Sequence, residues 1–161
     1  MATWQRWFFW LSTAGTTVTG SAIIVMKYFL KPMGGFSIVN HTLQPLMLKL
    51  HILFAALMLF GLGTLLINHI VPYFFKGKQK KGRKTGFVNL MLVPVMVLSG
   101  YLIQMITPLH LLKIIEYTHI YSSIAFVVVF VMHQYRTAPE RKVGVTIALL
   151  LLAGLTWVLC L

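Results

Sequence analysis

LLKIIEYTHIYSSIAFVVVFVMHQY, residues Leu111–Tyr135, is an apolar stretch that carries two histidines, His119 and His133. They are fourteen residues apart, so in an α-helix they lie within about 40° of one face and about 21 Å apart along the axis. The hydrocarbon core of a membrane is about 30 Å thick, which puts one imidazole near each side of it. Ionisable groups at such depths are costly and usually functional. We therefore expect a membrane helix with two functional histidines.

A second stretch matches the first. LKLHILFAALMLFGLGTLLINHI carries His51 and His69, which are eighteen residues apart. Eighteen residues make five whole turns, so this pair is also predicted to share one helical face. The two spacings differ by four residues, or about 6 Å of rise, so the two helices must tilt relative to each other or the site at one end is distorted.

The composition indicates an all-α integral membrane protein. Of 161 residues, 58% are hydrophobic and 10% are charged, whereas soluble domains carry about 25% charged residues. The net charge of +12 comes from basic residues between apolar spans, so it predicts topogenic loops that contact anionic lipid, and not nucleic acid. The single cysteine, Cys160, excludes an internal disulfide, a CxxC metal site and a covalent CxxCH haem site. There is no GxGxxG or P-loop for a nucleotide.

Five apolar spans are long enough to cross a membrane, within a single membrane domain, residues 1–161. Residues 1–75 and 86–135 form a weak internal repeat, because Thr19-Gly20 precedes one histidine helix as Ser99-Gly100 precedes the other. We expect four helices to form a bundle around a cofactor and residues 143–161 to add a peripheral helix. The spans are Trp7–Phe29, Leu46–Phe74, Phe87–Thr107, Leu111–Tyr135 and Val143–Leu161.

The loops predict the orientation. Ten basic residues lie in or beside the link after span two, after span four and before span one, against four on the other side. Because cytoplasmic loops are enriched in Lys and Arg, the N-terminus is predicted to be cytoplasmic and the C-terminus periplasmic. Spans two and four then run in the same direction. His51 and His119 are predicted to lie near the outer surface, and His69 and His133 near the inner one.

Two pairs of histidines at matched depths predict two non-covalent haems b, with His51 and His119 as axial ligands of one iron and His69 and His133 of the other. A zinc site would need three or four clustered ligands, and a proton relay would need carboxylates in the core. Histidines that only hydrogen-bond between helices remain the simpler alternative. Lys49 and Lys113 lie near the outer pair and are candidates to bind haem propionates, although snorkelling lysines are as good an explanation.

The chain also resembles a family over spans one to four. His119-x13-His133 with Gln134-Tyr135, Ser99-Gly100, and Arg6-Trp7-Phe8-Phe9-Trp10 with Thr19-Gly20 are similar to di-haem membrane cytochromes b, the quinone-reactive subunits of formate dehydrogenases and nickel–iron hydrogenases. In that family the first helix commonly reads Arg-x-x-His-Trp, and its histidine ligates the inner haem. This chain has Phe9 there, and we interpret His69 as a relocated ligand.

The resemblance implies a function and a setting. The expected function is electron transfer across the bacterial inner membrane between quinone and a redox partner subunit, such as a multihaem c-type cytochrome or an iron–sulfur protein. Such a subunit is not expected to turn over a substrate unaided. A histidine-bearing proton or ion transporter subunit and a cofactor-free membrane anchor are the alternatives.

Overall fold

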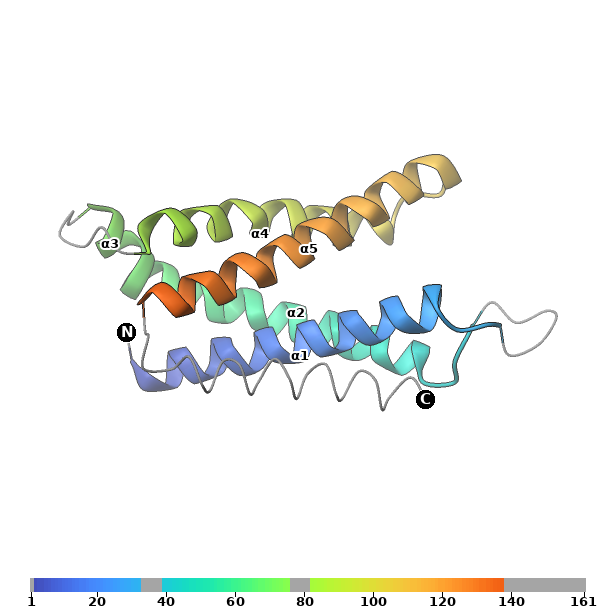
Figure 1. Ribbon diagram of the computed structural model, residues 1–161, viewed down its shortest axis with the longest axis horizontal. Helices are drawn as coiled ribbons and strands as arrows, with labels where there is room; N and C mark the ends of the chain where they lie inside the picture. Colours follow the sequence, from blue (N-terminus) through green and yellow to red (C-terminus); the bar gives the residue numbers. More distant parts are fainter. Residues whose placement is uncertain (1, 33–38, 76–81, 138–161) are drawn as a thin grey trace. The chain divides into compact units, whose positions relative to one another are not determined.

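The computed structural model describes residues 2–32, 39–75 and 82–137. In these ranges all regular structure is helical, and four helices are long and apolar enough to cross a membrane, as in a multi-pass membrane protein. The elements in chain order are α1 (Thr3–Tyr28), α2 (Gln44–Leu65), η1 (Leu66–Ile70), α3 (Val71–Phe75), α4 (Arg83–Ile103) and α5 (Leu109–Thr137), as drawn in Figure 1.

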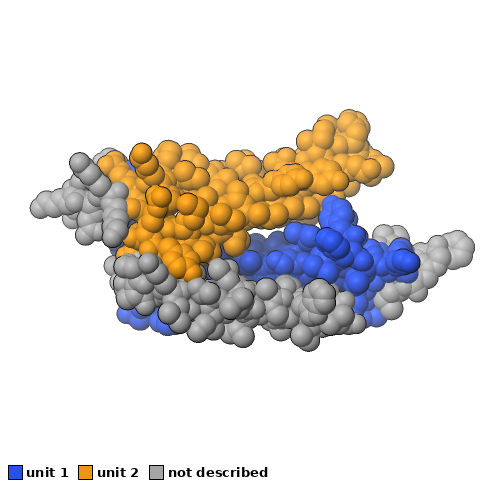
Figure 2. Space-filling model, viewed as in Figure 1, with its two compact units in different colours: residues 1–76, 146–161 blue, residues 77–145 orange. Residues whose placement is uncertain are grey.

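The chain divides into two compact units, which Figure 2 colours separately. The described part of unit 1 contains α1, α2, η1 and α3, and that of unit 2 consists of α4 and α5. In each unit the two long helices pack against each other along their length as an antiparallel hairpin. In each unit a long helix is followed along the chain by a histidine-bearing long helix.

The four observed helices cover the first four predicted spans, with some changes at their ends. The largest change is in α4, which begins at Arg83 and ends at Ile103, about one turn earlier at both ends than the predicted Phe87–Thr107. Pro108 accounts for part of this difference, because the residue before a proline is disfavoured in the α conformation, and Thr107 lies outside the helices. The predicted fifth span, Val143–Leu161, lies outside the described residues.

Small residues let the helices of unit 1 approach closely. A Cβ on Gly15 of α1 would lie 2.5 Å from Cδ1 of Phe54 in α2. A Cβ on Gly61 of α2 would lie 3.3 Å from the Cα of Phe9. Membrane helices associate through such small-residue contacts, since lipid supplies no hydrophobic driving force between them. The hairpin interface is therefore specified by where the glycines fall.

The segment that continues α2 at its C-terminal end departs from α geometry. η1 is a single π-helical turn, and His69 lies within it. A π turn contains about one residue more than an α turn, so residues beyond it are rotated by about 100° relative to a continuous α-helix. The five-turn register predicted to put His51 and His69 on one face therefore holds only as far as Leu65. Such π turns occur frequently at functional sites.

Candidate functional site

His51 of α2 is packed directly against the backbone of α1. Its Nδ1 lies 3.1 Å from the carbonyl oxygen of Thr16 and 3.2 Å from Oγ1 of Thr19. The Thr19 hydroxyl donates to the carbonyl of Gly15 at 2.7 Å, so its oxygen remains available as an acceptor. A Cβ on Gly20 would lie only 2.9 Å from Cε1 of His51. The ring therefore occupies space that only a glycine leaves open.

His119 of α5 has the same surroundings in unit 2. Its Nδ1 lies 2.8 Å from the carbonyl oxygen of Met96 and 3.2 Å from Oγ of Ser99. The Ser99 hydroxyl donates to the carbonyl of Val95 at 2.7 Å. A Cβ on Gly100 would lie 2.9 Å from Cε1 of His119. Each contact reproduces one made by His51.

His133, near the other end of α5, is held in the same way. Its Nδ1 lies 3.2 Å from the carbonyl oxygen of Gly82 and 3.0 Å from Oγ1 of Thr85. The Thr85 hydroxyl also donates to the Gly82 carbonyl, at 3.0 Å. A Cβ on Gly86 would lie 3.3 Å from Cε1 of His133. This third ring has slightly more room than the other two.

We call this arrangement a histidine cradle: a backbone carbonyl at position i, a hydroxyl at i+3 and a glycine at i+4 of one helix, all around a histidine of the antiparallel neighbour. The described part of the chain contains three cradles, one in unit 1 and two in unit 2. In unit 2 the two cradles are fourteen residues apart on α4, as are His119 and His133 on α5. Equal separations on antiparallel helices keep each histidine opposite its own cradle.

The cradle determines which ring nitrogen carries the proton. A carbonyl oxygen can only accept a hydrogen bond, so each Nδ1 must be the donor and each Nε2 must carry the lone pair. A neutral imidazole in this tautomer is a metal ligand, and a bond from Nδ1–H to a backbone carbonyl is the usual support for such a ligand. All three rings are half-buried. The cradles therefore present three oriented imidazoles whose Nε2 atoms are chemically suited to bind a metal.

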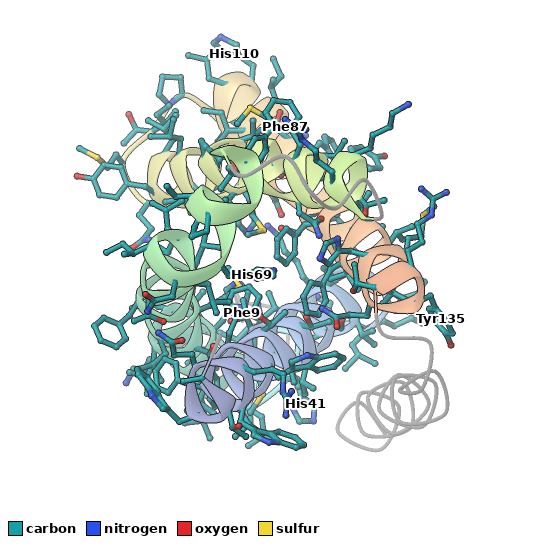
Figure 3. The ribbon with its side chains drawn as sticks, turned by 90° about the vertical axis from the view of Figure 1, so that its left-hand side faces the viewer. Phe9, His41, His69, Phe87, His110 and Tyr135 are labelled. Carbon is teal, nitrogen blue, oxygen red and sulfur yellow. The ribbon has the colours of Figure 1, made fainter. Side chains whose placement is uncertain are left out.

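The fourth predicted ligand, His69, has a different setting. It lies in η1, is half-buried, and is on the same side of the α1–α2 hairpin as Phe9 (Figure 3). Phe9 is 8% exposed and packs over Gly61. Phenylalanine at this position therefore fills the interface between α1 and α2.

The two candidate lysines are exposed, and the two other histidines of the described residues lie outside the cradles. Lys49 and Lys113 are exposed. Lys49 is two residues before His51, about 200° around the helix, so it does not share the cradle face. His41 accepts the backbone N–H of Leu43 at 3.1 Å, a local loop bond, and His110 is exposed at the start of α5. The role of the two lysines with haem propionates stays a prediction.

The cradle of His133 was not predicted from the sequence. Thr19-Gly20 and Ser99-Gly100 were interpreted as markers of a repeat, and in the structure both pack against histidines. The sequence does contain a signal for the third cradle: Thr85-Gly86 is another hydroxyl–glycine pair, fourteen residues before Ser99-Gly100.

No protein-family model, curated protein or solved structure matches this chain.

Proposed function

We propose that this chain is a membrane-embedded cytochrome b subunit that binds two non-covalent haems and passes electrons between the quinone pool and a redox partner subunit. The observation that carries the proposal is the set of three cradles, which fix His51, His119 and His133 as Nδ1–H tautomers. Haem iron bound by two imidazoles accepts and releases one electron. The ligand chemistry of the chain fits that group.

The residues around each histidine have separate tasks. The carbonyl and the hydroxyl hold the proton on Nδ1 and make the ring a stronger electron donor, because a hydrogen-bonded imidazole is more basic at its other nitrogen. The glycine leaves room for the Cε1 edge of the ring to approach the neighbouring helix. The proposed pairing of His51 with His119 and of His69 with His133 rests on the depths predicted from the sequence.

A proton or ion transporter explains the cradles less well. A histidine that relays protons must accept a proton at one ring nitrogen and release one from the other. Here Nδ1–H donates a hydrogen bond to a backbone carbonyl, which cannot accept the proton itself. Nδ1 is therefore not free to release its proton along a relay. An anchor without a cofactor would gain little from burying Thr19, Thr85 and Ser99 around three imidazoles that share one tautomer.

The partners follow from the proposed reaction. An electron carrier in the membrane needs a mobile donor or acceptor, for which quinone is our proposal, and a protein on one side of the bilayer. As for the resembling family, that protein would be a multihaem c-type cytochrome or an iron–sulfur subunit. The location would be the bacterial inner membrane, and the chain would carry electrons without turning over a substrate alone.

The test is the cofactor content of the purified full chain. We expect two haems b per chain, extractable by acidic acetone, with a visible spectrum that changes on reduction by dithionite. His51→Leu and His119→Leu should each lower the content to one, while the control His110→Leu, which changes an exposed histidine outside the cradles, should retain two. A chain purified from haem-supplemented cells with no haem would overturn the proposal.

A further inference from the structure

The repeat between the two units breaks at one position. The cradles of His51 and His119 are eighty residues apart on their helices, so the unit 2 cradle of Gly82, Thr85 and Gly86 corresponds to Ala2, Gln5 and Arg6 in unit 1. Counting fourteen residues on from His51, as from His119 to His133, leads to Leu65. Unit 1 thus has a leucine where unit 2 has its inner histidine.

The residues at this fourth position do not form a cradle. Gln5 is 4% exposed, accepts the backbone N–H of Ala2 at Oε1, 3.1 Å away, and donates from Nε2 to the carbonyl of Thr64 at 3.4 Å. Its amide therefore connects α1 to the residue before Leu65, which is itself 6% exposed. Arg6 has a Cβ where the cradles have glycine. In the pose of His133 an imidazole at position 65 would be tight against that Cβ, because the corresponding Cβ on Gly86 would lie 3.3 Å from Cε1 of His133.

His69 cannot use a cradle of this design. Because α1 and α2 are antiparallel, moving four residues beyond Leu65 on α2 requires moving four residues back from Gln5 and Arg6 on α1. Those positions precede Thr3, where α1 begins. His69 also lies in the π turn, whose backbone departs from the α register. The cradle geometry therefore does not extend to His69, which lies at a helix end that is wider than an α turn.

Resting on the proposed function, we propose that the inner haem is bound firmly by His133 alone, and that its opposite axial position exchanges with a small neutral diatomic ligand. His133 keeps the orienting carbonyl, hydroxyl and glycine, whereas the corresponding position of unit 1 is occupied by Leu65. Carbon monoxide is the probe, since it binds ferrous haem only where an axial position is open or readily vacated. The outer haem, with a cradled ligand on each side, is closed to it.

The experiment uses the purified full chain with its haems, reduced by dithionite and titrated with carbon monoxide. We expect about half of the haem to shift its spectrum, one carbon monoxide per two haems. His69→Ala should retain this haem and tighten carbon monoxide binding, because the competing imidazole is gone. His133→Ala should remove the responding haem. The control His110→Ala should behave as the unchanged chain.

The outcomes separate this inference from the proposed function. If the chain holds two haems with low-spin ferric spectra and neither binds carbon monoxide, the inner haem has no exchangeable axial position and this inference is wrong. The proposed function would be unaffected. A single haem that is lost in both His51→Ala and His119→Ala would show that there is no inner site, and would also overturn the inference. Absence of any haem overturns both. Loss of the responding haem in His69→Ala would show that His69 is a firm ligand.

Discussion

The glycine of a cradle can be tested with one methyl group. In Gly100→Ala the new Cβ would stand 2.9 Å from Cε1 and 3.2 Å from Nδ1 of His119. Ordinary van der Waals contact begins at 3.4 Å, so the ring must move by about half an ångström. The bond from Nδ1 to the Met96 carbonyl, now 2.8 Å, then stretches or bends beyond good hydrogen-bond geometry.

The effect on stability is expected to be small. Losing the bond costs about 0.5–1.5 kcal/mol, and replacing a glycine in a helix by alanine regains about 0.8–1.0 kcal/mol. The two terms nearly cancel. Haem affinity should respond more strongly, because removing the support of a metal-bound histidine typically weakens binding by about 10–100-fold. The signature of a cradle is therefore weaker haem binding with nearly unchanged unfolding.

The assay is the rate of haem transfer to excess apomyoglobin, followed by absorbance, alongside a thermal melt of the same sample. Two glycines of unit 1 provide controls. Gly63→Ala meets nothing within 4 Å and should leave haem transfer unchanged. Gly15→Ala pushes against the ring of Phe54 and should lower the melting temperature without a selective effect on haem. If Gly100→Ala releases haem no faster than Gly63→Ala, the cradle does not support a ligand.

The other predictions concern the hydroxyl, the pairing and the topology. Ser99→Ala removes one hydrogen-bond acceptor from His119 Nδ1, which should make the imidazole a weaker electron donor to the iron. The midpoint potential of that haem should then rise by up to about 60 mV, whereas Ser99→Thr should leave it unchanged. A redox titration of His51→Leu and of His119→Leu should lose the same step; loss of different steps would contradict the predicted pairing. A periplasm-dependent reporter fused after Leu161 should be active, and activity of a cytoplasm-dependent reporter there would reverse the orientation or change the span count.

The sequence was sufficient to predict the helices because their signal is length and hydropathy. Four of the five spans correspond to α1, to α2 with η1 and α3, to α4 and to α5, with the ends displaced by up to four residues. Helix ends depend on local effects such as the proline before α5, which hydropathy does not register. The predicted span Val143–Leu161 lies outside the part of the chain that the structure describes.

The candidate site could be predicted only in part. Ionisable residues in apolar spans identified all four histidines, but periodicity assumes a uniform α-helix. The π turn at Leu66–Ile70 makes that assumption invalid for His69. No sequence pattern predicted this π turn. The hydrogen bonds of the histidine Nδ1 atoms could not be predicted either, because they depend on which turn of one helix faces which turn of the next. That register is determined by how the two helices pack.

The register between antiparallel helices also explains why each hydroxyl–glycine pair faces a histidine. In an antiparallel hairpin, a step forward on one helix is matched by an equal step back on the other, so a histidine and its cradle must shift together. His119 and His133 satisfy this with Ser99-Gly100 and Thr85-Gly86, and His51 satisfies it with Thr19-Gly20. At the fourth place the rule selects Leu65 and Gln5-Arg6, which carry neither an imidazole nor a hydroxyl–glycine pair. The two helices of unit 1 are thus consistent with each other at that position, because the cradle residues and the histidine are replaced together.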